Sequence, residues 1–597
     1  MIEPRLYRAM FLPALLAAVI AAFSLEDRPR AVPQGLPADV LFEGALASST
    51  AKAMVESAPD RRAGTAGDAR TARRVAGAFR RYGFETQVQR FEDGGDELAN
   101  VIGTRPGQSR EQIVLLASRD ALSVPDATSS AADTAALMEV ARVLSGRATN
   151  KTVVLVSVDG ATRGHVGARR FAESIDDPGL VNGVLVLSNT GARRSHGPLL
   201  VDWSNDDRRG SLGLRRTATD SLRNEVGTDG GPTATPPAQL ARMAFPAGEG
   251  PQGVLLERGL PALRLSGSGE RAPPRGQRTI DDLRPGRYGD LGRSALRVVS
   301  ALDASRTPPE YGPRSYILAG GGVVPGWALL LLAAGLILPP LVTSIDALAR
   351  ANRRRESLRG WFAWVTVGTI PFAAGLALAE LLVVVGLAEN APPAPLEPSL
   401  VPVDGRAGWN MALVAGVVLV AWALLRTPVL RRRRLPDPAE PGAGVATSLC
   451  LCALVIGTWF LNPFAALLLA LPLNCWMVAT LADVRRSTRI WLALAGLLPA
   501  AIVIGTYMRE LRLDPLEAVW YLFLLVTGAQ VGLPTALLLC ALAGLFGATV
   551  AIAVARRHSD APAPETAVPD LGRPSAIGPA TRLEGAPPPR RRSLLRR

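Results

Sequence analysis

Residues 113–118 read IVLLAS, and two further runs of the same kind follow, TVVLVSV at 152–158 and GVLVLS at 183–188. A continuous apolar run of this length is typical of a strand buried on both faces, as in parallel sheets. Apolar residues at helical spacing separate the runs, at 130–145 and 164–174. This alternation predicts an α/β domain, with a mainly parallel central sheet and flanking helices.

The preceding segment extends the same domain. Helical patterns cover 49–58 and 66–83, with Gly83 as a stop signal, and strand patterns cover 84–91 and 98–104. Sites in such sheets form in loops beyond the carboxyl ends of the strands. We therefore expect a site in three loops: 118–129, 159–165 and 188–196.

The second half of the chain has a different character. Hydrophobic residues make up 48% of the sequence, and they concentrate in long runs broken by short charged loops, which predicts a bundle of transmembrane helices. The expected spans are 317–344, 361–388, 409–426, 444–461, 463–482, 489–508 and 533–555, preceded by an uncleaved anchor at 9–25. Residues 514–530 either lie at the membrane interface or form a ninth span; we favour eight spans.

Arginine clusters set the expected orientation. The net charge is +14, and the basic clusters flank apolar spans, at Arg353–Arg355, Arg431–Arg434, Arg485–Arg486 and Arg556–Arg557. Positive residues beside spans mark the cytoplasmic side, so the α/β domain is expected outside and the tail inside, with the lipid bilayer as partner. The same placement argues against nucleic acid as a partner.

The domain organisation follows from these patterns. We expect an N-terminal anchor at 1–26, a linker at 27–44, an extracytoplasmic α/β domain at 45–310, a multi-span domain of about seven helices at 317–556, and a disordered basic cytoplasmic tail at 557–597. All four cysteines lie in the membrane half, so no disulfide is expected in the α/β domain. The arginine-rich, lysine-poor composition suggests a bacterial plasma membrane.

Several motifs in one order resemble a known family. They are RAGTAG at 62–67, NVIG at 100–103, ALMEVAR at 136–142 and RGLPALR at 258–264. Together they resemble the M28 peptidases, which are zinc-dependent aminopeptidases and related hydrolases, over about 45–305. The resemblance implies a hydrolase-like α/β fold carrying two zinc ions, each held by histidine and carboxylate ligands.

Transfer of the family's zinc site onto this sequence leaves it without ligands. The first histidine falls on Ser118, the bridging aspartate on Ser129, the paired glutamates on Ala161 and Thr162, the next aspartate on Ser188 or Asn189, and the last histidine on Arg278. Asp120 survives, at the position that orients the first histidine. We therefore expect no catalytic residue, no metal and no cofactor. The alternative is an active zinc aminopeptidase whose ligands are misaligned.

The vacated positions define a predicted cleft. Its residues are Ser118, Arg119, Asp120, Ser129, Ala161, Thr162, Arg163, Ser188 and Arg278. Its arginines suit an anionic ligand such as a carboxylate or phosphate. The simpler interpretation, which we favour, is that they pair with Asp120, Asp126 or Asp159.

The remaining candidates are few. The chain has only three histidines, His165, His196 and His558, and the first two are most simply a helix-start residue and a loop residue. A Ser–His–Asp set of Ser118, Ser129 or Ser130 with His165 and Asp120 is a minor alternative.

Glu380 is the one acidic residue well inside an expected span, where an ionisable group is costly and often functional. The leading hypothesis is an inactive peptidase-like protein that binds an anionic or peptide ligand, or subunits of a membrane complex. A transporter or lipid-handling protein with an accessory domain is the other alternative.

Overall fold

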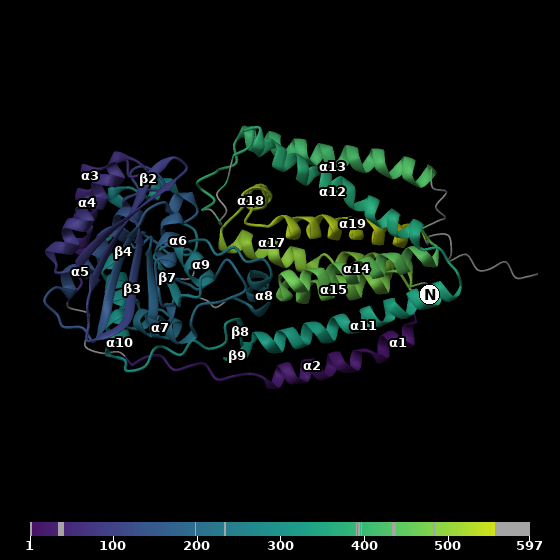
Figure 1. The fold of residues 1–597 in the computed structure, drawn as a ribbon, viewed down its shortest axis with the longest axis horizontal. Helices are drawn as coiled ribbons and strands as arrows, with labels where there is room; N and C mark the ends of the chain where they lie inside the picture. The colour runs from purple at the N-terminus through teal and green to yellow at the C-terminus, as the bar shows by residue number, and fades with distance from the viewer. Residues whose placement is uncertain are drawn as a thin grey trace, which may run out of the picture.

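The protein is described from a computed structural model. It defines residues 3–33, 41–197, 199–231, 234–389, 391, 395, 397–432, 438–481 and 484–555. The predicted tail at 557–597 and the middle of the predicted linker lie outside the described residues. An α/β half adjoins a bundle of long helices that run in roughly one direction (Figure 1).

One seven-stranded sheet organises the α/β half. Its strands are β1 (Glu85–Asp93), β2 (Asp96–Arg105), β3 (Ser109–Ser118), β4 (Lys151–Val158), β5 (Val181–Ser188), β6 (Leu200–Val201) and β7 (Ala262–Ser266). They lie in the order β1-β2-β4-β3-β5-β7-β6. Strands β4, β3, β5 and β7 are parallel, whereas β1, β2 and β6 add antiparallel edges. The predicted α/β fold is confirmed, and the three apolar runs are its central strands.

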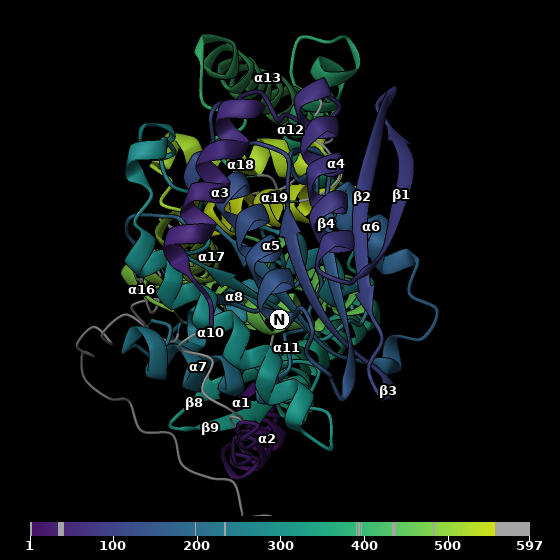
Figure 2. The same ribbon diagram turned by 90° about the vertical axis from the view of Figure 1, so that its left-hand side faces the viewer.

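Helices cover both faces of this sheet. They are α3 (Gly44–Ser57), α4 (Ala66–Arg81), α5 (Ala132–Leu144), α6 (Val166–Glu173), α7 (Leu212–Val226), α8 (Pro236–Ala244), α9 (Pro251–Glu257) and α10 (Pro285–Ala304). Alternate residues of a strand face opposite sides. Leu115 accordingly belongs to the core that the sheet forms with α3, α4, α5, α7 and α10, while Leu116 belongs to the core formed with α6 and α9. Helices α3, α4 and α5 cover the face turned away from the bundle (Figures 1 and 2). Burial on both faces explains the unbroken apolar strands.

The bundle begins later than the sequence pattern predicted. Residues 317–325 fall mostly in a hairpin, β8 (Tyr316–Ala319) and β9 (Gly322–Pro325), and the first helix starts at Gly326. The turn uses Gly320 and Gly321 at positive φ, which glycine adopts without the steric cost of a Cβ atom. The predicted span at 317–344 was therefore placed about nine residues too early.

The described apolar helices otherwise follow the predicted spans. They are α1 (Pro4–Ala9), α2 (Phe11–Phe23), α11 (Gly326–Arg353), α12 (Arg359–Val384), α13 (Gly405–Arg432), α14 (Pro441–Leu461), α15 (Pro463–Ala479), α16 (Arg486–Ala495), α17 (Leu498–Glu510), α18 (Pro515–Thr527) and α19 (Leu533–Ala555). Seven of the described helical segments are long and apolar enough to cross a membrane, counting α1–α2 and α16–α17 as one each. Helix α15 has 17 residues, about 26 Å at ~1.5 Å per residue, against a hydrocarbon core of ~30 Å. Helix α18 lies crosswise at the end of the bundle beside the α/β half (Figure 1).

The two halves are joined through α8. The last carbonyl groups of a helix lack partners within the helix. Here the Asn462 amide donates to the carbonyl oxygens of Met243 (2.8 Å) and Ala244 (3.3 Å), and the Tyr507 hydroxyl donates to that of Phe245. Three orphaned acceptors of α8 are thus satisfied by the membrane half, which fixes the α/β half on the end of the bundle.

Candidate functional site

The predicted site lies where parallel strands β3, β4, β5 and β7 end. The loop after β3 contains a π-helical turn at Ala127–Ala131 that leads into α5. The loop after β4 contains a short 3-10 turn at Ala161–Arg163, and α6 then starts after His165. Each vacated zinc-ligand position can therefore be located and its side-chain partners named.

Asp120 holds the loop after β4. One carboxylate oxygen accepts the Ala161 backbone N–H at 2.9 Å, and the other accepts the Thr162 backbone N–H and hydroxyl, each at 2.9 Å. Burial raises the pKa of Asp120, while these hydrogen bonds lower it. Both oxygens are committed to the loop, so Asp120 now positions the backbone of the two residues that replace the glutamate pair.

Arg119 is fully buried in a cluster of acidic side chains. Its guanidinium pairs with Asp68 (2.7 Å) and Asp159 (3.1 Å) and donates to the Ala99 carbonyl oxygen (2.8 Å). All three charged side chains are at most 3% exposed. Burial raises the pKa of Asp159 to about 7, against the attraction of Arg119. Pairing with Asp159 agrees with the simpler sequence interpretation, but Asp68 was not among the predicted partners.

Arg163 has different ion-pair partners from Arg119. It forms ion pairs with Asp96 and, at 3.7 Å, with Asp93, both on the β1–β2 hairpin. It also donates to the Asp93 carbonyl oxygen at 2.7 Å. The structure therefore does not bring Arg119, Arg163 and Arg278 together in one anion-binding pocket.

The serines at the former ligand positions have local roles. Ser129 is buried within the π-helical turn, and its hydroxyl has no hydrogen-bond partner among the described residues. Ser188 is half-buried at the end of β5 and accepts a hydrogen bond from the Asn189 side chain at 3.2 Å. Ser118 is likewise half-buried at the end of β3.

Asp133, near the bridging position, is turned toward the β5 loop. Its carboxylate accepts the backbone N–H groups of Asn189 and Thr190, each at 2.8 Å, and the Thr190 hydroxyl at 2.7 Å. Burial raises the pKa of Asp133 to about 7, and these hydrogen bonds lower it in part. Like Asp120, this acid holds a loop and has little capacity left for a metal ion.

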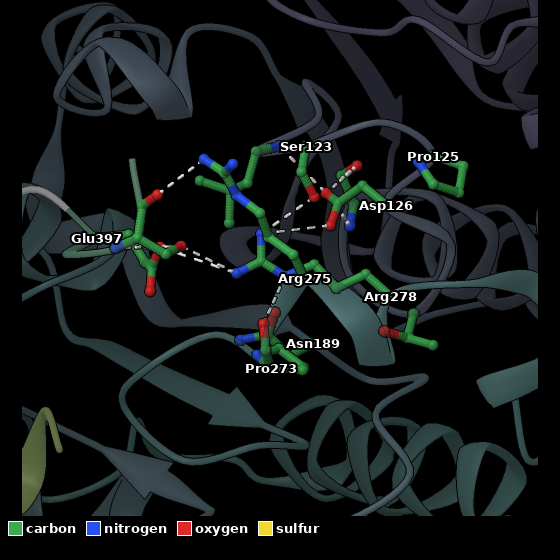
Figure 3. A network of polar contacts seen from close by, with 12 residues as sticks. Ser123, Pro125, Asp126, Asn189, Pro273, Arg275, Arg278 and Glu397 are labelled. Carbon is green, nitrogen blue, oxygen red and sulfur yellow. Dashed lines mark hydrogen bonds and ion pairs between the residues drawn. The ribbon is translucent and has the colours of Figure 1, made fainter. Parts of the chain in front are cut away.

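Arg278, at the position predicted for the last histidine of the family, is the centre of a buried network. Figure 3 shows its guanidinium between Asp126 and Ser123 on one side and Glu397 on the other. The guanidinium donates to the Pro273 carbonyl oxygen at 2.5 Å and to the Ser399 hydroxyl at 3.1 Å, and it lies 3.8 Å from Asp126 and 3.9 Å from Glu397. Arg278 is 1% exposed, and Asp126 and Glu397 are buried with it.

Glu397 and Ser399 belong to the segment between α12 and α13, so the membrane half reaches into the predicted site. The Arg275 guanidinium donates to the Ser399 carbonyl oxygen at 3.2 Å. Burial raises the pKa of Glu397, while the Ser399 hydroxyl and Arg278 lower it. A guanidinium and two carboxylates thus meet at a position where the family carries a metal ligand.

These residues do not fit a zinc ion. Among the described residues no group of three histidine, cysteine or acidic side chains is placed to hold a metal. His165 precedes α6 in the left-handed conformation, and its buried Nδ1 has no hydrogen-bond partner in the described part of the chain. Burial, with Arg264 and Arg169 nearby, lowers the pKa of His165 to about 3. The acids at the vacated positions hold backbone loops or arginines.

The Ser–His–Asp alternative gains no support from the geometry, because the Asp120 oxygens are used by Ala161 and Thr162. His196 is exposed in the loop after β5, and His558 lies outside the described residues. Glu380 lies four residues before the end of α12 and is half-buried, and no hydrogen bond or ion pair joins it to another described residue.

Comparison with known proteins supports the family resemblance. Residues 100–229 match the model of peptidase family M28. The resemblance predicted from the motifs is confirmed for this segment, which runs from β2 into the loop after α7. No curated protein sequence matches the chain.

Solved structures of the same type are similar to the α/β half. A glutaminyl cyclase from an Acidobacteriales bacterium is 19% identical, with 46% of this chain and 98% of that chain covered and a TM-score of 0.37. The zinc aminopeptidase BSAP from Bacillus subtilis is 12% identical, with 47% and 99% covered and a TM-score of 0.37. The LapA aminopeptidase of Legionella pneumophila is 17% identical, with 45% and 73% covered and a TM-score of 0.37.

Sequence reasoning missed three residues that determine the site. Asp68 and Glu397 are acids far from the vacated positions in sequence, and Arg61 is a buried arginine that donates to the carbonyl oxygens of Pro125 and Asp126. Asp68 follows the capping residue Thr65, so its sequence signal was that of an ordinary helix start. Arg61 directly precedes the motif at 62–67, and that position was the one available signal for it.

Proposed function

We propose that the protein is a catalytically inactive relative of the M28 peptidases, anchored in the membrane, whose α/β half acts as a binding or scaffold module. The Arg278 network carries this proposal. A buried cation, paired with Asp126 and Glu397, stands where the family places a zinc ligand. A second cation within a few ångströms of this guanidinium would be repelled strongly in a site of low dielectric constant.

The direction of the helices supports an extracytoplasmic α/β half. Helix α11 starts beside the α/β half at β9 and ends in Arg353 at the far end of the bundle, and α12 returns from there (Figure 1). Arg485 is the N-cap residue of α16, and Arg486 is its first residue. The preceding helix α15 starts after its N-cap Asn462, which contacts α8 of the α/β half, and runs away from it, so α16 starts away from the α/β half. Positive residues favour the cytoplasmic side, so the α/β half is proposed to lie on the other side.

Metal analysis of the full-length protein tests the proposal. The detergent-purified protein is incubated with excess zinc, desalted and measured by inductively coupled plasma mass spectrometry, beside an authentic M28 aminopeptidase. We expect less than about 0.2 zinc per chain and no hydrolysis of aminoacyl p-nitroanilides. Two bound zinc ions with hydrolysis would establish the alternative of an active metallopeptidase and overturn the proposal.

A further inference from the structure

A second polar site lies at the junction of the two halves. A cavity of about 250 Å³ opens there between the loops after β5 and β7 and two segments of the bundle. Its polar lining residues are His196, Ser268, Glu270, Arg271, Ser399, Glu510 and Arg512. Neither the family motifs nor the vacated zinc positions include the bundle residues of this set.

Two carboxylates at the cavity each have an oxygen without a hydrogen-bond donor among the described residues: Glu510, which lines the cavity with a side chain 12% exposed, and Glu397, which binds the lining residue Ser399. The buried Oε2 of Glu510 accepts no hydrogen bond from the described residues, and its nearest cation, Arg242 Nη1, is 3.5 Å away. Arg242 instead binds Glu270 closely. The buried Oε1 of Glu397, beside the cavity, also lacks a donor among the described residues, with Arg271 Nε at 3.7 Å. Buried acceptors without donors are costly, so a ligand that brings N–H donors is favoured here.

The mouth of the cavity is positively charged. Arg512 is exposed, and its guanidinium forms no hydrogen bond or ion pair with other residues that the structure describes. His196 and Arg194 are exposed beside it. Burial, then Arg512 and Arg194, lower the pKa of His196, as expected for a cationic surrounding. An anionic group is therefore favoured at the mouth. A phosphate fits best, because the Arg512 guanidinium can donate two hydrogen bonds to it.

The position of the cavity relates it to the membrane surface. Glu510 is the last residue of the apolar segment Arg486–Glu510, and Arg512 follows two residues later. Helix α18, with Trp520, lies crosswise at the same end of the bundle (Figure 1). The volume of the cavity, about 250 Å³, is below the ~300–1,000 Å³ of pockets for drug-sized ligands. A lipid headgroup therefore suits it better than a long peptide.

We propose that this cavity binds the zwitterionic headgroup of a membrane phospholipid, with a primary ammonium donating to Glu510 and the phosphate contacting Arg512. Phosphatidylethanolamine has this chemistry. A choline headgroup has no N–H donors for the buried carboxylates, and a glycerol headgroup has no cation. The proposal requires the membrane placement of the bundle but not the loss of catalysis, so the two proposals can fail separately.

Binding of short-chain lipids to the full-length protein in detergent tests this site. The probes are dihexanoyl phosphatidylethanolamine, phosphatidylcholine and phosphatidylglycerol, together with O-phosphoethanolamine and glycine, measured by isothermal titration calorimetry. We expect saturable 1:1 binding of the ethanolamine lipid, with the choline and glycerol lipids weaker by about 10-fold or more, as for the loss of a charge-assisted hydrogen bond.

Three variants separate the contributions. Arg512→Gln is expected to weaken ethanolamine-lipid binding by about 10-fold, and Glu510→Gln is expected to remove the preference over the glycerol lipid. Arg73→Gln, an exposed arginine on α4 far from the cavity, is the matched control and leaves binding unchanged. Because Arg512 is exposed, its variant keeps the fold even if Glu510→Gln does not.

Several outcomes would overturn the proposal. Three results would show that the cavity does not recognise this headgroup: no saturable binding, binding of the choline lipid as tight as that of the ethanolamine lipid, or an effect of Arg73→Gln as large as that of Arg512→Gln. Binding of glycine or free O-phosphoethanolamine as tight as that of the lipid would assign the cavity to a soluble ligand instead.

Discussion

The sharpest test of the site compares two arginines, each paired with two aspartates. Arg119 is fully buried with Asp68 and Asp159, whereas Arg163 is 26% exposed and its partners Asp93 and Asp96 are 35% and 49% exposed. Replacement of each by methionine keeps much of the side-chain volume and removes the charge. Burial is thus the main difference between the two variants.

The expected magnitudes differ severalfold. Arg119→Met leaves two buried carboxylates without their cation, which costs about 3–5 kcal/mol of the free energy of unfolding. Arg163→Met breaks exposed ion pairs worth about 0.2–1 kcal/mol, plus hydrogen bonds to carbonyl oxygens worth about 1 kcal/mol. Pulse proteolysis of the full-length protein in a urea series measures both values, because cleavage reports the unfolded fraction of the α/β half.

The pH dependence gives a second, independent readout. Without Arg119, the folded-state pKa of Asp159 rises further above its unfolded value, from about 7 in the native protein. In the folded variant Asp159 then holds a proton that it lacks in the unfolded chain. Protonated Asp159 therefore stabilises the folded variant at low pH, and this stabilisation is lost as the pH rises. The penalty of Arg119→Met should therefore shrink between pH 8 and pH 5. Equal penalties for the two arginines, or a pH-independent penalty for Arg119→Met, would refute the reasoning.

Three further predictions concern other parts of the chain. His165→Phe should make the stability of the protein less sensitive to acid. The folded-state pKa of His165 is about 3, below its unfolded value, so the native protein loses stability as the pH falls below ~6.5, by at most ~1.4 kcal/mol per pH unit. Unfolding measured at pH 7 and at pH 5 would show that the variant lacks this loss. Gly335→Ala should destabilise the packing of α2 on α11 by about 1–3 kcal/mol, because the new Cβ would lie 2.9 Å from the Ala14 Cα. Thermal unfolding measures this loss. Gly505→Ala is the control, because its Cβ would have no neighbour within 4 Å. Glu380→Gln should change thermal stability by less than about 0.5 kcal/mol, and a larger loss would reveal a partner for this carboxylate.

Local patterns predicted most of the fold. Three unbroken apolar strands, two helices between them and the long apolar spans are each encoded within short windows, because burial on both faces or in lipid demands apolar side chains throughout. The error at 317–325 arose for the same reason: apolar residues of a short hairpin resemble the start of a span, and only the positive φ angles at Gly320 and Gly321 separate the two.

The candidate site was only partly predictable. The vacated ligand positions follow from the order of the motifs, and Asp120 was identified as a positioning residue that had lost its histidine. Its present partners, the backbone N–H groups of Ala161 and Thr162, carry no side-chain signal in sequence. The predicted pairing of arginines with nearby acids was right for Asp126 and Asp159 and missed Asp68 and Glu397. It was wrong for Asp120, because the oxygens of Asp120 accept hydrogen bonds from Ala161 and Thr162.

By itself the sequence determined the α/β fold class and, apart from the start of the first span after the α/β half, the position of the apolar spans, and it predicted that Ser118, Ser129 and Arg278 stand at zinc-ligand positions of the family. Each of these depends on residue type and order along the chain. The tertiary structure decided that Arg119 and Arg163 pair with different acids, that Glu397 from the membrane half reaches Arg278, and that Glu510 and Arg512 line a cavity with loops of the α/β half. Such pairings join residues up to hundreds of positions apart, and a charge in sequence does not specify its partner, since Coulomb attraction depends on distance and burial in space.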